Sequence, residues 1–204
     1  MSRAHIENMK KAVSGYYSAV GEASDRISKN NSMYREDIAE AENKKVLSGL
    51  RDKRSAAEDA IIKAQDAGMM EAASWGRLDG AKITDDAKLL QMELSPEQFN
   101  ELKERYKGNG TMSAMLVQYA HQHNAAKQAD DPSAIMRFNV LDIPTTESKQ
   151  KAYSAFANGA LHLLDRMDSN DGFLSGTNSE MLKAAVETFG EPTQMNAQLF
   201  ELID

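Results

Sequence analysis

The first 78 residues contain no proline, and apolar side chains recur through them at the spacing of an α-helix. The stripe begins at Ile6 and advances in alternate steps of three and four residues, which places its members on one helix face. Its members are Ile6, Met9, Val13, Tyr16, Val20, Ala23 and Ile27. Because so long an apolar stripe has to be covered, it predicts packing against another helix of this chain or of another copy.

A second long helix is expected over about residues 33–76. Its stripe changes phase near residues 43–45, which indicates a change of packing partner or of supercoiling. The polar run 28–32 separates the two stripes and is typical of a turn. The segment is therefore either a helical hairpin that folds at Asn30 and Asn31 or one continuous rod, and we expect the hairpin. The apolar positions of the second stripe are Tyr34, Ile38, Ala41, Leu47, Leu50, Ala57, Ile61 and Ala64, with Arg54 among them.

The rest of the chain carries start signals for several shorter helices. Ser95 is followed by proline, with Gln98 three residues after the serine, which predicts a capping box. Residues 135–144 alternate in part and are the one place where we expect an extended segment. Other expected N-cap residues are Thr84, Thr111, Thr145, Thr177 and Thr193. We therefore predict an all-α protein with a helical arm or hairpin over residues 1–78 and a compact multi-helix body over residues 81–204.

The chain has no cysteine, which excludes disulfides, thiolate nucleophiles and cysteine-ligated zinc. No apolar run approaches the roughly 20 residues that span a bilayer, and the first residues lack the apolar core of a signal peptide. We expect no membrane partner and a protein kept in a cytoplasm, or in the host cytoplasm or virion if a phage encodes it.

The net charge of −7 is unevenly distributed. Residues 1–76 are neutral overall, so residues 77–204 carry all of the excess acid. An acidic surface repels phosphate backbones, and we do not expect direct binding to nucleic acid. One alternative function follows, an adaptor or chaperone-like module whose acidic C-terminal helices engage a basic partner.

A second alternative comes from the loop that starts at Asp168. Together with Asn170, Asp171 and the following glycine, it looks similar to an EF-hand calcium loop. The spacing is one residue off in either register, so an Asx-rich turn between helices accounts for it better. Asp168, Asn170 and Asp171 remain the only candidate metal ligands, for a calcium-influenced helical protein.

No catalytic motif is present. His121 and His123 are two residues apart, so on a helix they point to different faces and do not chelate one metal. Neither a metalloprotease, a serine hydrolase, a phosphate-loop nor a dinucleotide fingerprint occurs. We expect a protein that is not an enzyme and that binds no cofactor.

The long amphipathic arm, the absence of cysteine and the all-helical character together resemble small bacteriophage structural and assembly proteins, such as scaffold, portal-associated or minor virion components. The resemblance covers the style of the whole chain and transfers no individual residue. It implies a structural or assembly protein that forms oligomers or docks on a larger particle. The residues expected to make that contact are Ile6, Met9, Val13, Tyr16, Val20, Ile27, Tyr34, Ile38, Leu47, Leu50 and Ile61.

Overall fold

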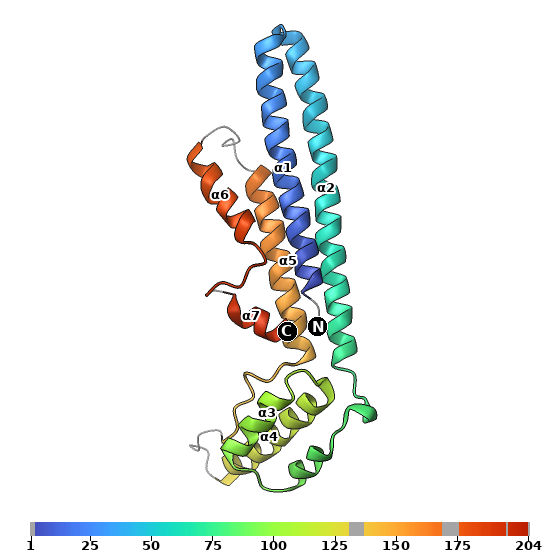
Figure 1. The fold of residues 1–204 in the computed structure, drawn as a ribbon, viewed down its shortest axis with the longest axis vertical. Helices are drawn as coiled ribbons and strands as arrows, with labels where there is room; N and C mark the ends of the chain where they lie inside the picture. Colours follow the sequence, from blue (N-terminus) through green and yellow to red (C-terminus); the bar gives the residue numbers. More distant parts are fainter. Residues whose placement is uncertain (1–2, 131–136, 169–175, 195, 204) are drawn as a thin grey trace. The chain divides into compact units, whose positions relative to one another are not determined.

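A computed structural model describes residues 3–130, 137–168, 176–194 and 196–203, with the backbone alone described at 176–179. All regular structure in these ranges is helical, so the all-α class is confirmed. The segment 135–144, where an extended segment was expected, forms no strand in its described part, because residues 137–145 combine bends and a turn at 141–142 with irregular backbone. The elements are α1 (Ala4–Met33), α2 (Glu36–Trp75), η1 (Gly80–Lys82), η2 (Asp85–Gln91), α3 (Pro96–Arg105), α4 (Gly110–Asp130), α5 (Thr146–Asp168), α6 (Gly176–Thr188) and α7 (Ala197–Ile203) (Figure 1).

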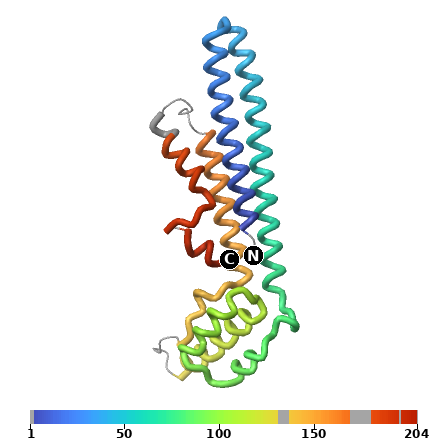
Figure 2. Tube along the Cα trace, in the orientation of Figure 1, coloured from blue at the N-terminus to red at the C-terminus, as the bar shows by residue number. Residues whose placement is uncertain are grey.

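Helices α1 and α2 form an antiparallel hairpin (Figure 2). The turn lies at Tyr34 and Arg35, a few residues later than expected, because α1 continues through the polar run to Met33. Asn30 and Asn31 do not end the helix, since their side chains hydrogen-bond to Asn43 across the hairpin. Asparagine side chains usually favour turns because they hydrogen-bond to nearby backbone. Here they hydrogen-bond across the hairpin instead.

The chain forms two compact units, which differ from the expected division at residues 78 and 81. The first, here called the bundle unit, contains residues 2–68 and 152–200, and the second, the insert unit, contains residues 69–151 and 201–204. The expected boundary is displaced because part of α5 and all of α6 pack with the hairpin.

The core of the bundle unit is built from apolar faces of α1, α2, α5 and α6. Gly68 allows α2 and α5 to approach closely, since a Cβ atom there would lie 2.6 Å from the Tyr153 ring. Gln65 also donates a hydrogen bond to the Ser154 hydroxyl at 3.1 Å. Buried members of this core include Ile6, Met9, Val13, Ile61, Tyr153, Phe156, Leu164, Met167, Leu182 and Val186.

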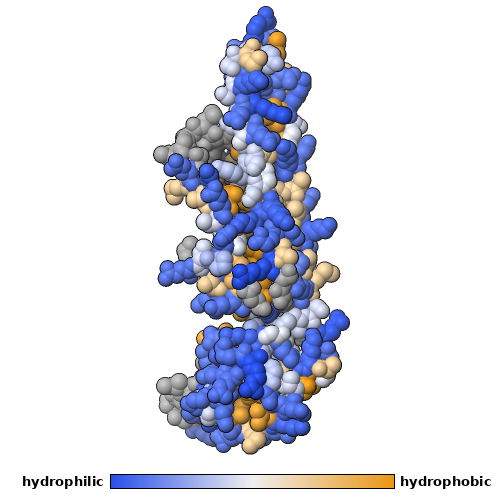
Figure 3. All heavy atoms as spheres, in the orientation of Figure 1, coloured by the Kyte–Doolittle hydropathy of each residue, from blue (hydrophilic) through white to orange (hydrophobic). Residues whose placement is uncertain are grey.

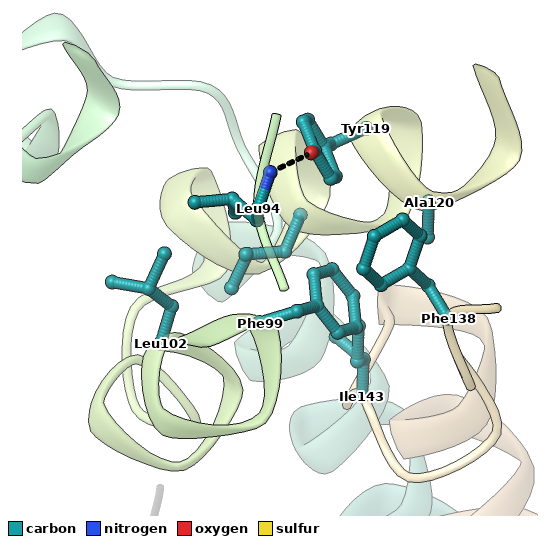
Figure 4. Close-up of a cluster of buried hydrophobic side chains, with 8 residues drawn as sticks. Leu94, Phe99, Leu102, Tyr119, Ala120, Phe138 and Ile143 are labelled. Atoms are coloured by element: carbon teal, nitrogen blue, oxygen red, sulfur yellow. Dashed lines mark hydrogen bonds between the residues drawn. The ribbon is translucent and has the colours of Figure 1, made fainter. Parts of the chain in front are cut away.

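The core of the insert unit is an aromatic cluster between α3, α4 and the segment that follows α4 (Figure 4). The Tyr119 hydroxyl accepts a hydrogen bond from the Leu94 backbone N–H at 2.8 Å, so its polar end is satisfied inside the cluster. Phe99 and Phe138 lie with ring centroids 4.9 Å apart. The cluster contains Leu94, Phe99, Leu102, Leu116, Tyr119, Ala120, Phe138 and Ile143.

The helix caps of the insert unit agree with the sequence at two positions and differ at two others. The capping box of Ser95 is confirmed, and Thr145 accepts a hydrogen bond from the Ser148 N–H at 3.0 Å. Asn109 rather than Thr111 caps α4, because α4 begins at Gly110 and the Thr111 hydroxyl accepts from the Asp79 N–H instead. Thr84 precedes η2 but donates to the Tyr106 hydroxyl. The side chain of Thr177 lies outside the described residues.

The only tryptophan joins several segments of the insert unit. Its indole N–H donates to the Gly108 carbonyl at 3.1 Å, and the Lys149 ammonium lies 4.6 Å from its ring centroid. Lys149 is buried, and its ammonium donates to the carbonyl of Leu202. Trp75 and Lys149 thus hold the last turn of α7 within this unit.

No described helix is both long enough and apolar enough to cross a bilayer.

Candidate functional site

The apolar stripes that the sequence nominates for interaction divide into a covered part and an exposed part. Near the start of α1, Ile6, Met9 and Val13 are at most 1% exposed, and Tyr16 is also buried. On α2, Ile61 is fully buried and Leu50 nearly so. These side chains are used by the protein's own core, so they are not available to a partner.

The exposed part lies near the turn of the hairpin. Tyr34, Ile38 and Leu47 are 47%, 46% and 43% exposed, while Val20 and Ile27 are partly buried. Met33 is 63% exposed and was not among the nominated residues. Its position directly before Tyr34, the first residue of the second stripe, was the signal that could have identified it.

Helix α5 ends where this exposed part begins. Its last residue, Asp168, forms an ion pair with Arg54 on α2 and accepts a hydrogen bond from Tyr16 on α1. Figures 1 and 2 show that α1 and α2 continue beyond the ends of α5 and α6. We call this continuation, residues 17–53, the distal hairpin.

A single face of α2 passes from covered to uncovered. Ile61, Arg54, Leu47 and Glu40 follow one another at intervals of seven residues and therefore share that face. Ile61 is buried, and Arg54 pairs with α5 residues, but Leu47 and Glu40 are exposed. Leu47 thus occupies a position equivalent to a core residue without a helix over it.

Two open grooves flank the distal hairpin. The first lies on the side of Leu47, and the second, with a volume of about 260 Å³, lies between the helices on the opposite side. Both are lined by a mixture of small or apolar side chains and charged side chains. Figure 3 shows isolated hydrophobic side chains among hydrophilic ones on the visible face of the hairpin. The first is lined by Asn31, Tyr34, Glu36, Ala39, Glu40, Asn43, Lys44 and Leu47, and the second by Ala19, Glu22, Ala23, Arg26, Glu42, Lys45, Val46, Gly49, Leu50 and Lys53.

The two helices of the distal hairpin bury few large apolar side chains against each other. Its buried apolar side chains are mostly alanines, among them Ala19, Ala23 and Ala39. Near the turn, Asn43 donates to Asn31 at 2.8 Å and accepts from Asn30 at 3.0 Å. Polar residues at such seam positions fix the register of paired helices and add less stability than apolar ones.

Asp168 is the one member of the candidate cation site that the structure describes, and both of its carboxylate oxygens already have protein partners. One oxygen of Asp168 accepts from Tyr16, and the other pairs with Arg54. Arg54 also pairs with Glu58 at 2.5 Å and with Asp165 at 2.6 Å. Burial, followed by the hydrogen bond to Asp168, raises the pKa of Tyr16 well above its usual value. Asn170 and Asp171 lie outside the described residues.

Among the described residues, no group of three or more histidine, aspartate or glutamate side chains is arranged to hold a metal ion. His5 packs edge-on against Tyr153, and His123 lies 4.1 Å from the Tyr119 ring, so both belong to aromatic packing. His121 and His162 are exposed on their helices.

The distal hairpin is therefore the strongest candidate site, and its shape suits a macromolecular surface better than a small ligand. Comparison of the chain with protein-family models, curated proteins and solved structures found no match.

Proposed function

We propose that the protein is a non-enzymatic structural or assembly protein that binds protein partners through the distal hairpin. The observation that carries this proposal is the exposure of Met33, Tyr34, Ile38 and Leu47 on one two-helix projection of the bundle unit. Full burial of one large apolar side chain contributes about 1.5–3 kcal/mol. A protein partner that covers several of these side chains therefore gains binding free energy from each of them.

The architecture of the hairpin supports the same function. A helix pair whose seam is made of alanine and asparagine gains little from its own packing, and isolated helices are marginal in water. A partner that covers the hairpin would supply the packing that α5 supplies to the part nearer the base. The hairpin is thus suited to complete its core in an assembly.

The composition supports a setting for this function. A cysteine-free chain suits a reducing cytoplasm or a particle assembled there. Together with the resemblance in style to phage assembly proteins, this supports a cytoplasm or a virion as the setting of the proposed assembly.

Site-specific photo-crosslinking tests the proposal in cells that produce the protein. A photoreactive amino acid at position 47 is expected to give covalent protein adducts heavier than the 22.5 kDa chain. The matched control places the same amino acid at position 141, because Leu141 is 84% exposed but lies in the insert unit. Adducts at neither position, or equal adducts at both, would contradict a partner surface on the hairpin.

A further inference from the structure

We propose that the distal hairpin binds a second copy of itself, antiparallel and about a two-fold axis, to form a four-helix bundle. This inference rests on the proposed function and names its partner. It is carried by the arrangement of charge along α2 together with the exposed Leu47 of the same face.

The net charge of the distal hairpin favours self-association. Residues 17–53 contain as many basic as acidic side chains, although the whole chain has a net charge of −7. Two copies therefore meet through their neutral segment without the repulsion that their acidic parts impose on each other. A strongly charged partner would find no matching excess of charge here.

Acidic and basic side chains are also separated from each other along α2. The stretch 36–42 is acidic, whereas basic residues predominate in the stretch 44–53. In a parallel pair, acid would face acid and base would face base. In an antiparallel pair, each acidic stretch faces the basic stretch of the other copy. The acidic residues are Glu36, Asp37, Glu40 and Glu42, and the basic residues are Lys44, Lys45, Arg51 and Lys53, with Asp52 among them.

One face of α2 presents this order of charges on exposed side chains. Glu36, Glu40, Lys44, Leu47 and Arg51 are spaced by three or four residues and share one face. All five are exposed, and the four charged ones have no ion-pair partner among the residues that the structure describes. An axis between Asn43 and Lys44 places Glu36 of one copy opposite Arg51 of the other, while Glu40 and Lys44 lie within one helical turn of each other across the pair.

The apolar groups of that face fit the same register. Leu47 of one copy faces Ala39 and Glu40 in the groove of the other, and the reverse holds by symmetry. The paired segment is roughly 25 Å long and two helices wide. It buries on the order of 1,000 Å² in total, the size of a small specific interface. We therefore expect a dimer whose dissociation depends on concentration and salt.

Cysteine crosslinking tests the orientation, because the native chain has no cysteine to interfere. Glu36→Cys and Arg51→Cys variants are oxidised separately and as a mixture. An antiparallel dimer gives crosslinked dimer in the mixture and little in either variant alone, and the second Glu36–Arg51 pair of the mixed dimer stays intact. Glu36→Cys mixed with Lys88→Cys is the control, since Lys88 is exposed in the insert unit. Crosslinking of Glu36→Cys to itself, or none in the mixture, would overturn the proposal.

Charge reversal tests the pairing by an independent route. By light scattering, Glu36→Lys/Glu40→Lys and Lys44→Glu/Arg51→Glu are each expected to be monomeric where the native chain is dimeric. Their equimolar mixture is expected to form a dimer. All the changed side chains are exposed, and the helical circular dichroism of each variant confirms its fold.

The outcomes separate the two proposals. A native chain that stays at 22.5 kDa at millimolar concentration overturns the second-copy proposal. Adducts of position 47 with a different protein would then still support an assembly function. Absence of both dimers and adducts removes both proposals.

Discussion

Arg54 of α2 forms an ion pair with Asp168, the last residue of α5, at the level where the hairpin leaves its covering helices. The same aspartate accepts a hydrogen bond from Tyr16 of α1, so one carboxylate joins three helices of the bundle unit. This carboxylate marks the boundary between the packed base of the hairpin and its distal part.

Replacing Asp168 with asparagine is expected to lower the free energy of unfolding by about 1 kcal/mol, because the charge opposite Arg54 is lost in a partly shielded site. Asp165→Asn is the matched control. Its carboxylate is 66% exposed and also pairs with Arg54, and we expect a loss below about 0.5 kcal/mol. Urea unfolding measures both, and equal losses would show that the position of Asp168 has no special importance.

The hydroxyl of Tyr16 makes the stability of the folded protein depend on pH in the alkaline range. Burial and the hydrogen bond to Asp168 raise the pKa of Tyr16 above its unfolded value of about 10, so the unfolded state loses this proton first. Stability from this group is present below pH 10 and falls as the pH rises further, by up to about 1.4 kcal/mol per pH unit. Tyr16→Phe is expected to unfold with a shallower pH dependence between pH 10 and 11.5.

Tyr34→Phe serves as the control for that measurement, since the Tyr34 side chain is 47% exposed near the turn. It should follow the native alkaline profile. A Tyr16→Phe profile that also coincides with the native one would contradict the assigned role of Tyr16.

Two glycines of the hairpin are expected to respond oppositely to alanine. At Gly68 the added Cβ atom would lie 2.6 Å from the Tyr153 ring, and overpacking of this kind costs about 1–3 kcal/mol. At Gly21 nothing lies within 4 Å, so alanine should stabilise α1 by about 0.5–1 kcal/mol through helix propensity. Thermal unfolding of both variants checks the prediction, which fails if the two changes have the same sign.

The hydrogen bonds of Asn43 are expected to hold the end of the hairpin closed. Asn43→Ala removes the bonds to Asn30 and Asn31, and we expect faster amide hydrogen exchange around the turn, by roughly fivefold for a loss of about 1 kcal/mol. Ser48→Ala is the control, since Ser48 is exposed on the same helix. Unchanged exchange in Asn43→Ala would show that the asparagines do not hold the helices together.

Lys149 is expected to anchor the last turn of α7. Lys149→Met keeps the length of the side chain but removes its donor to Leu202 and its charge near Trp75, and we expect about 1–3 kcal/mol of destabilisation with a changed tryptophan emission spectrum. Lys151→Met, at an exposed position two residues later, should change stability by less than about 0.5 kcal/mol. Equal effects at both positions would contradict the anchor.

The helices could be predicted from the sequence because each has local signals. The stripe of α1 and the capping box of Ser95 depend on spacing within one segment. The turn was displaced because Asn30 and Asn31 have two possible uses, a local turn or a bond across the hairpin, and only the position of Asn43 decides between them. Thr111 was misassigned as a cap because Asn109 stands two residues earlier with the same capability.

The division of the interaction stripe could not be predicted from the sequence. Val13 and Leu47 have the same apolar character, yet one is buried and the other exposed. The difference depends on where α5 ends relative to the hairpin, which is a contact between distant parts of the chain. The division into units escaped sequence reasoning for the same reason, because it depends on α5 and α6 returning to α1 and α2.

The interrupted bundle unit also determines the order in which its parts emerge during synthesis. About 80 residues separate the part of α2 that belongs to this unit from the part of α5 that covers it. At about 5–20 residues per second, the nascent hairpin waits roughly 4–16 s before α5 is made. Throughout that interval the hairpin side chains that α5 and α6 later bury have no covering helix.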